Sequence, residues 1–161
     1  MSKPCRPSDS SIASYAPRTF FVTTRTAAGR SLFQTDRMAD LLIEVLRDNM
    51  RSGKMAIHDF VIIPNHVHVL MTLSGETSVE KAMQLIKGSF SFRARTELGF
   101  GGEIWQRGYL DVQILGDGSF RQHREYIDKN PVKAGLASTP EEYPFGTAYL
   151  KKRKQGLKPA E

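Results

Sequence analysis

The feature that most constrains the fold of this chain is a pair of strand-like segments separated by only two residues. Segments 55–63 and 66–73 are dominated by β-branched and other apolar side chains, as is typical of strands. Pro64 and Asn65 lie between them, and such a pair is a common turn signal. A connection this short joins antiparallel strands, because parallel strands need a much longer crossover. The centre of the chain therefore predicts an antiparallel sheet.

A strand and a helix are expected before this pair. Residues 19–26, with the sequence TFFVTTRT, carry the β-branched and aromatic bias of a strand. Residues 36–52 place apolar side chains at helical spacing, and Gly53 follows as a stop signal. The apolar positions of this helix are Met38, Leu41, Leu42, Val45 and Leu46. The chain thus opens with a strand–helix unit.

A second long helix is expected after the pair. Thr77 and Glu80 have the spacing of a capping box and predict a helix over about residues 78–98. Gly99 follows as its stop signal. The apolar face of this helix consists of Val79, Ala82, Met83, Ile86, Phe90 and Ala94. Such a stripe indicates a helix that packs on one face against a core.

The rest of the chain supplies a fourth strand near 109–114 and a last helix. This helix is expected to stop at Asn130, because Pro131 disfavours helical geometry in the residue before it. The complete order is strand, helix, strand, strand, helix, strand and an extra helix. This βαββαβ order predicts a ferredoxin-like α+β fold, in which one antiparallel sheet carries two helices on one face.

Length and charge bound the domain organisation and the class of partner. The 161 residues suit a single domain, expected over 18–150, with a flexible arm rich in Ser and Pro at 1–17 and a basic tail at 151–161. Cys5 is the only cysteine, which excludes an internal disulfide and any multi-cysteine zinc site. The net charge of +6 favours a polyanionic partner.

Nothing in the sequence points to a membrane. No apolar run approaches the roughly 20 residues that would span a bilayer. The first residues, MSKPCRPSDSS, lack the apolar core of a signal peptide. We therefore expect a cytoplasmic protein without a membrane partner, associated with the nucleoid if its polyanionic partner is DNA.

The strand at 66–73 holds the sharpest chemical signal. Side chains alternate between the two faces of a strand, so His66 and His68 point to one face while Val67 and Val69 point to the core. The two imidazoles then stand about 7 Å apart along the backbone, a common way to present nitrogen ligands to one metal ion. A pair of ordinary surface histidines is the alternative interpretation.

The last helix presents a second set of polar side chains. Tyr126 and Asn130 are one helical turn apart and share a face. Phe120 and Ile127 occupy a neighbouring face and are expected to anchor the helix to the core. Taken singly, Tyr126 is equally explained as a half-buried aromatic residue, and Asn130 as a residue suited to a helix end before proline.

The two sets together have the composition of a phosphoryl-transfer site. A phenol has a pKa of about 10 and is a poor nucleophile near neutral pH unless its electrophile is activated. A divalent metal on a phosphate oxygen gives that activation and orients the group for in-line attack. Two imidazoles, one further oxygen ligand and a nearby hydroxyl are required. His66, His68, Asn130 and Tyr126 supply these groups.

Longer stretches of the chain resemble a known family. FVIIPNHVHVLM together with REYIDKNPVKAGL resembles the single-tyrosine HUH transposases, and most closely their REP-associated tyrosine transposase branch. The resemblance covers nearly the whole chain. It extends to FFVTTRT, GRSLFQ, MQLIKGSFSFRARTELG, IWQRGYLD and EEYPFGTAY.

The resemblance implies a ferredoxin-like domain that cuts single-stranded or hairpin DNA, such as REP-like repeats or insertion-sequence ends. Members attack with a tyrosine, which leaves a 5′-phosphotyrosine link and a free 3′-hydroxyl. Tyr126 matches that nucleophile, His66 and His68 match the metal ligands, and Asn130 matches the third, polar ligand. The implied metal is Mg²⁺, or Mn²⁺ in its place. Monomeric and homodimeric members both occur, so the oligomeric state stays open.

Further residues are candidates for contact with DNA. Trp105 either packs beneath the catalytic helix or stacks on a base, and His123 lies one turn before Tyr126 on the same helix face. The other candidates are basic: Lys87, Arg93, Arg95, Arg107, Lys151, Lys152, Arg153 and Lys154. Such residues can bind phosphates, and the alternative for them is a solvated surface.

Two other functions compete with DNA cleavage by a tyrosine. Ferredoxin-like sheets also occur as nucleic-acid-binding modules without catalytic activity, although a binding module has no need of paired histidines facing a tyrosine. A phosphodiesterase that uses water is the third possibility, but the two-histidine enzymes of that class need a second histidine motif. His58 and His123 do not supply one.

Overall fold

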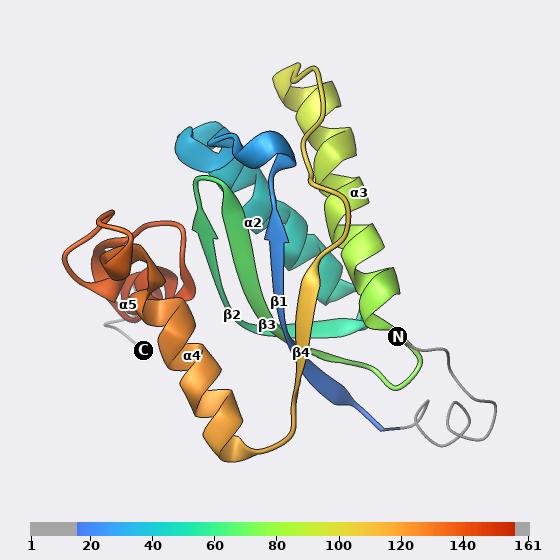
Figure 1. Cartoon of the computed structure of the whole chain (residues 1–161), viewed down its shortest axis with the longest axis vertical. Coiled ribbons are helices and arrows are strands. Elements are labelled where there is room, and N and C mark those ends of the chain that lie inside the picture. Colours follow the sequence, from blue (N-terminus) through green and yellow to red (C-terminus); the bar gives the residue numbers. More distant parts are fainter. Residues whose placement is uncertain (1–15, 157–161) are drawn as a thin grey trace.

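The computed structural model describes residues 16–156, and these form a four-stranded antiparallel sheet with helices on both faces (Figure 1). The strands lie in the order β2-β3-β1-β4. Their bounds are β1 Arg18–Arg25, β2 Met55–Ile63, β3 His66–Leu73 and β4 Leu110–Ile114. The helices are α2 Asp36–Arg51, α3 Val79–Leu98, α4 Asp117–Lys133 and α5 Thr147–Gly156, with short 3₁₀ turns at Ala27–Gly29 (η1), Leu32–Gln34 (η2) and Pro140–Glu142 (η3).

The βαββαβ prediction is confirmed. β2 and β3 form the expected hairpin, in which Ile63 pairs with His66 and Met55 pairs with Leu73. β1 lies between β3 and β4 and pairs antiparallel with both. A register shift between Ile57 and Asp59 marks a bulge in β2. The sheet therefore has the strand order and pairing of a ferredoxin-like fold.

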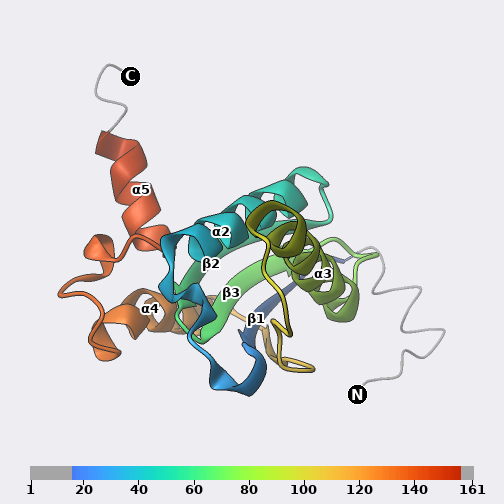
Figure 2. The same ribbon diagram turned by 90° about the horizontal axis from the view of Figure 1, so that it is seen from above.

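The main core lies between the sheet and the helices α2 and α3. Seen from above, these two helices cover one face of the sheet, and α4 lies against the other (Figure 2). Val67, Val69 and Met71 of β3 point to the helix-covered face, as their alternation predicts, and are at most 2% exposed. Phe33, Leu42 and Phe90 are among the largest side chains buried in this core. Burial of these apolar side chains is the main force that holds the layers together.

A smaller apolar cluster holds α4 on the opposite face. Ile127 is 1% exposed and packs over this face, with Phe120 partly buried at its side, so both anchor the helix as predicted. The buried members of the cluster are Phe21, Val61, Ile63, Leu70, Ile114, Ile127 and Tyr143. α4 is thus attached to the face of the sheet that also carries His66 and His68.

The predicted start of α3 is wrong by one position. The helix begins at Val79, and the side chain of Ser78 accepts a hydrogen bond from the Lys81 backbone N–H at 3.0 Å. Thr77 instead shares a hydrogen bond with the Ser74 hydroxyl at 2.7 Å. Because Ser78 takes the capping position, Glu80 is one residue too early to complete a capping box. The expected stop at Gly99 is confirmed by its left-handed φ of 66°.

The predicted end of α4 is also wrong. The helix runs through Pro131 and ends at Lys133. Pro131 removes one helical hydrogen bond, since it has no N–H to donate to the carbonyl of Ile127. Its ring is buried, and only two residues of helix follow it. Burial of the ring, together with the hydrogen bond from the Ala134 N–H to the Asn130 carbonyl at 2.9 Å, offsets the lost bond.

Both ends of the chain extend past the described residues. The predicted N-terminal arm at 1–17 lies outside them except for Ala16 and Pro17. The first six residues of the predicted basic tail, 151–156, continue helix α5. Residues 157–161 lie outside the described part. No helix within residues 16–156 is both long and apolar enough to cross a membrane.

Candidate active site

The two histidines of β3 lie side by side on the face covered by α4. Their ring centroids are 4.9 Å apart. His68 is 4% exposed and stacks on Phe21 at 5.2 Å, while His66 is half-buried at the end of the strand. The prediction that both imidazoles share one face is confirmed. Neither is an ordinary surface histidine, because packing restricts both rings.

Each imidazole is held through its Nδ1 atom. The Thr23 hydroxyl lies 2.8 Å from Nδ1 of His68, and Oδ1 of Asn65 lies 2.8 Å from Nδ1 of His66. An amide oxygen can only accept, so Nδ1 of His66 carries the proton and its Nε2 keeps a free lone pair. Nε2 of His68 is buried and has no hydrogen-bond partner within the described part of the chain. Both Nε2 atoms are therefore suited to bind a metal ion.

Burial keeps both rings neutral. Burial, together with the smaller effects of the neighbouring His66 and Arg25, lowers the pKa of His68 to about 3. The pKa of His66 is lowered too, first by burial and then by the charge of Arg25. A metal ion binds only the unprotonated imidazole. The pair is therefore in its metal-binding protonation state at neutral pH.

Tyr126 of α4 lies directly against this pair. Its ring meets His68 edge-on with centroids 5.3 Å apart, and it contacts Phe21 in the same way at 5.9 Å. The side chain is 46% exposed, whereas the next residue, Ile127, is buried. One side of the phenol thus rests on the imidazole whose Nε2 atom lacks a partner among the described residues, and the other side is open to solvent.

Asn130 lies one turn beyond Tyr126 toward the His66 end of β3. Phe120, early in α4, contacts His58 at 5.4 Å, and Tyr126 contacts His68. The helix therefore advances along the sheet in the direction of the β2–β3 turn, where His66 lies. Asn130 is partly buried on this path. Its side-chain oxygen is the remaining donor of the predicted set.

The donors fit a divalent metal. The partnerless Nε2 of His68, the free Nε2 of His66 and an amide oxygen combine nitrogen with oxygen ligands. Among residues 16–156, no group of three or more His, Cys, Asp or Glu side chains could hold a metal ion. The predicted set of His66, His68 and Asn130 combines two imidazoles with one side-chain amide, so it is not a group of that kind.

A buried carboxylate that the sequence reasoning did not identify anchors α4. Asp59 of β2 is 1% exposed, and one of its oxygens accepts from Nε of Arg124 at 2.5 Å. Its other oxygen accepts from the Thr147 hydroxyl at 2.6 Å and from Nζ of Lys151 at 3.0 Å. Arg124 lies two residues before Tyr126, so this contact fixes the tyrosine-bearing helix to the sheet. A lone aspartate within the apolar strand MAIHDFVII was the available signal.

Several predicted DNA contacts are engaged within the protein. Arg93 pairs with Glu44, Asp48 and Glu97, and these carboxylates offset its charge. Lys151 binds the buried Asp59. Lys87 donates to two backbone carbonyls, and Arg95 reaches the carbonyl of Gly102 at 3.4 Å. None of these side chains is brought to the histidine pair.

Three of the other predicted contacts lie in three different regions. His123 is half-buried against Phe21, with ring centroids 4.8 Å apart, which places it beside the candidate site. Trp105 packs on Phe33 and Phe90 in the main core, so packing beneath α4 is excluded. The exposed Arg107 lines a cavity of about 260 Å³ next to Thr23.

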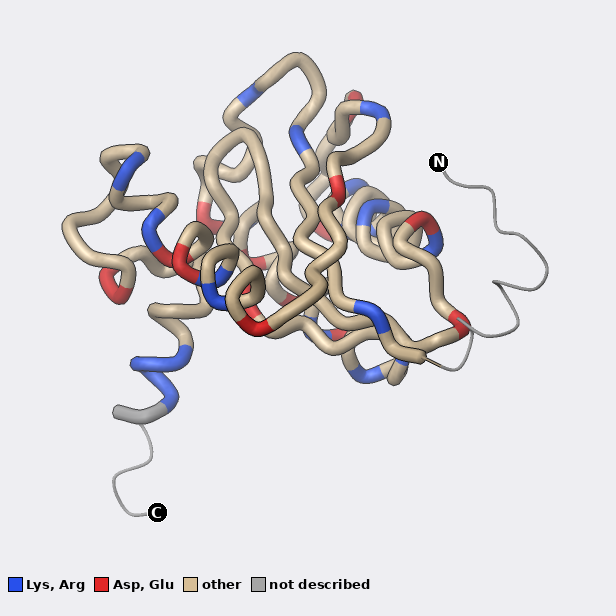
Figure 3. The backbone as a smooth tube through the Cα atoms, turned by 60° about the horizontal axis from the view of Figure 1, so that its bottom comes forward, with Lys and Arg blue, Asp and Glu red and all other residues tan. Residues whose placement is uncertain are grey.

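The basic residues near the C-terminus lie on α5. This helix projects from the body of the molecule (Figure 3). Lys152, Arg153 and Lys154 are exposed there, and Arg153 reaches the hydroxyl of Tyr149 at 3.4 Å. His58, predicted to be structural, donates to or accepts from the Thr72 hydroxyl at 2.7 Å and packs against Phe120.

Known proteins share this fold and part of this sequence. A REP-associated tyrosine transposase of Escherichia coli K12 is 29% identical over 133 residues, which is 80% of this chain and 75% of the relative. A solved structure of a REP-associated tyrosine transposase bound to a REP hairpin superposes with a TM-score of 0.68 at 27% identity. The superposed region covers 99% of this chain and 89% of the chain of the solved structure.

A further crystal structure, of a protein from Deinococcus radiodurans R1, has a TM-score of 0.54 at 19% identity and shows the shared fold alone. The superposed region covers 80% of this chain and 97% of the chain from Deinococcus radiodurans. The family model described as "Transposase IS200 like" matches residues 19–130, a span that runs from β1 through Asn130. These similarities confirm the resemblance inferred from the sequence motifs. The chain belongs to the IS200-like transposase family, whose members are DNA-processing enzymes.

Proposed function

We propose that this protein is a metal-dependent endonuclease and strand transferase that acts on single-stranded DNA next to hairpins. The observation that supports this best is the contact between Tyr126 and His68, whose buried Nε2 atom has no partner among the described residues. The proposed nucleophile and a proposed metal ligand are thus adjacent, and the tyrosine is partly exposed. The solved relative bound to a REP hairpin supports hairpin DNA as the substrate.

In the proposed reaction, the phenol oxygen of Tyr126 attacks a phosphodiester. A bond forms between this oxygen and phosphorus, and the bond from phosphorus to the 3′ oxygen breaks. The phenol loses a proton and the 3′ oxygen gains one, which leaves a 5′-phosphotyrosine and a free 3′-hydroxyl. In strand transfer, a 3′-hydroxyl attacks the phosphotyrosine and releases Tyr126.

The metal site would consist of His66, His68 and Asn130. Mg²⁺ or Mn²⁺ bound there would withdraw charge from the phosphate and orient it toward the phenol. The chain's own part is to keep both imidazoles neutral by burial and to hold their Nδ1 atoms through Thr23 and Asn65. Arg25 and Arg107, which line the cavity next to Thr23, would bind the flanking phosphates. The enzyme would act at the nucleoid.

The test is the covalent product. Labelled hairpin oligonucleotides with single-stranded flanks are incubated with protein and Mg²⁺, and a labelled protein band is sought on a denaturing gel. Tyr126→Phe is expected to abolish this band while DNA affinity changes less than about twofold. Tyr149→Phe, which changes a tyrosine of α5 away from the histidine pair, is the matched control and should retain the band.

Two outcomes would contradict the proposal. Cleavage that persists in Tyr126→Phe would show that water or another residue is the nucleophile. DNA binding without cleavage at any Mg²⁺ or Mn²⁺ concentration would favour a binding module that has no catalytic activity.

A further inference from the structure

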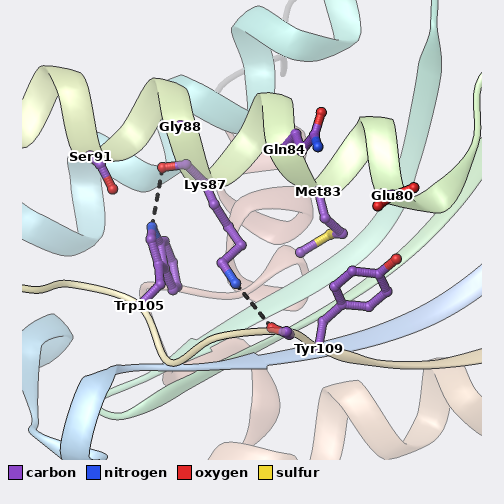
Figure 4. A pocket seen from close by; sticks show the side chains of 9 residues that line it. Glu80, Met83, Gln84, Lys87, Gly88, Ser91, Trp105 and Tyr109 are labelled. Carbon is purple, nitrogen blue, oxygen red and sulfur yellow. Dashed lines mark hydrogen bonds between the residues drawn. The ribbon is translucent and has the colours of Figure 1, made fainter.

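A second cavity lies on the other side of the molecule from α4, between α3 and the segment that precedes β4. Its volume is about 450 Å³. Figure 4 shows one stripe of α3 facing the extended segment across this space. The lining residues of α3 are Glu80, Met83, Gln84, Lys87, Gly88 and Ser91, and those of the segment are Trp105, Gly108 and Tyr109. The proposed cleavage chemistry uses none of them.

The aromatic wall of this cavity is held rigidly. Trp105 donates from Nε1 to the backbone carbonyl of Lys87 at 3.2 Å (Figure 4). Nζ of Lys87 donates to the carbonyls of Gln106 at 3.1 Å and Gly108 at 2.9 Å, and it lies 5.8 Å from the centre of the Trp105 ring. The charge of Lys87 is therefore used to fasten the segment to α3.

Gly88 leaves one side of the cavity open. It lies in the interior of α3, where glycine destabilises a helix relative to alanine. A Cβ atom added at this position would meet nothing within 4 Å. Packing within the described chain therefore does not require glycine here. Close approach of a ligand to the helix backbone would explain why glycine occupies position 88.

The cavity is connected to the proposed site through one segment of chain. Gly108 and Tyr109 also line the cavity of about 260 Å³ that contains Arg25, Arg107 and Thr23. Thr23 in turn contacts His68. A strand that passes the histidines and binds the two arginines would reach the far side of this segment, where the larger cavity opens.

We infer that the larger cavity binds one unpaired nucleobase of the DNA strand that flanks the cleavage site. This inference rests on the proposed function. A flat ring suits the space between the aromatic wall, Met83 and the open backbone at Gly88, since bases stack well on aromatic side chains. The carboxylate of Glu80 at the rim repels a phosphate but accepts from an exocyclic amino group. Adenine, cytosine or guanine is therefore preferred over thymine.

The test blocks the cavity without altering the fold. Gly88→Met places a side chain in the space, and Gly88→Ala serves as the conservative variant. Thr96→Met introduces the same side chain at an exposed position of α3 outside the cavity. Each is combined with Tyr126→Phe, so that binding is measured without cleavage. The probes are hairpin oligonucleotides that carry 2-aminopurine or an abasic site at each flanking position in turn.

We expect the probe at one flanking nucleotide position to report binding in the cavity. Its 2-aminopurine fluorescence should be quenched on binding to Tyr126→Phe alone and to the Thr96→Met variant, and the quenching should be lost with Gly88→Met. Gly88→Met should weaken binding at least about fivefold, the lower end of what one stacked base contributes. An abasic site at that position should abolish the difference in DNA affinity between Gly88→Met and its parent. Gly88→Ala should raise the melting temperature by a few degrees, which separates loss of the cavity from loss of the fold.

The results separate this inference from the proposed function. Equal affinity and equal quenching for Gly88→Met and its parent at every flanking position would overturn the base-binding assignment, even if wild-type protein forms the covalent product. If wild-type protein forms no covalent product but Gly88→Met still loses one quenched position, the base-binding site is supported and the cleavage proposal is contradicted.

Discussion

Arg124 of α4 and Asp59 of β2 form an ion pair in which Nε lies 2.5 Å from a carboxylate that is 1% exposed. Thr147 and Lys151 of α5 bind the other oxygen of the same carboxylate. A single buried aspartate therefore joins the edge strand of the sheet to the helix that carries Tyr126 and to the C-terminal helix.

Asp59→Asn should destabilise the protein by about 2 kcal/mol, because it removes charge-assisted hydrogen bonds to a buried group. The free energy of unfolding from urea denaturation checks this value. Asp48→Asn is the control, since Asp48 also pairs with arginines but is half-exposed. Its effect should stay within about 0.5 kcal/mol. Equal effects for the two variants would show that Asp59 is not an anchor.

Thr23→Val should weaken the binding of Mn²⁺ about tenfold, because it removes the hydrogen bond that orients the ring of His68. Valine has nearly the same shape as threonine, so the fold should persist. Isothermal titration calorimetry with Mn²⁺ gives the dissociation constant. Thr19→Val is the matched control on the same strand, since its hydroxyl bonds Thr72 and not a histidine of the pair. An unchanged affinity in Thr23→Val would contradict the proposed role of Thr23 in orienting His68 for metal binding.

The metal-free protein should lose stability as the pH falls below 6.5. The pKa of His68 is lowered from 6.5 to about 3, mainly by burial and also by His66 and Arg25, so the unfolded chain binds a proton in this interval that the folded chain does not. The contribution of His68 is therefore complete above pH 6.5 and declines by about 1.4 kcal/mol per pH unit below it. Urea denaturation of wild type and His68→Gln at about pH 7 and pH 5 isolates this contribution. Parallel pH dependence in both proteins would contradict it.

Arg107 and Arg93 should differ in their effect on DNA binding. Arg107 is exposed and lies beside Thr23, whereas Arg93 is paired with three carboxylates. Arg107→Ala should reduce the slope of log affinity against log salt by about one, as expected for one lost phosphate contact. Arg93→Ala should leave that slope unchanged. A reversed order would place the DNA on the α2–α3 side of the molecule.

Much of the fold could be predicted because local signals and tertiary packing agree. The β2–β3 hairpin follows from two apolar segments and a Pro64-Asn65 turn, and the structure reproduces both strands residue for residue. The error at the end of α4 occurred where tertiary packing outweighs a local preference. Pro131 is buried by the surrounding structure, and this keeps α4 helical past the point where proline alone would end it.

The candidate site was only partly predictable. Spacing within one element identified the histidine pair and the side chains on one face of α4, because alternation and helical periodicity are visible in sequence. The partners of those groups come from elsewhere in the chain. Thr23 is 45 residues from His68, and Arg124 is 65 residues from Asp59. A single sequence contains no signal for such long-range pairs.

The division of the apolar residues into two clusters has a consequence for motion. The cluster beneath α4 has far fewer buried members than the core beneath α2 and α3. Segments with little buried apolar area open locally at a lower free energy than the whole domain unfolds. Backbone amides of α4 should therefore exchange with deuterium when this helix detaches locally. Amides of β3 should exchange only when the whole domain unfolds. The side of the molecule that carries the tyrosine is then able to fluctuate without disturbing the layer that keeps the domain folded.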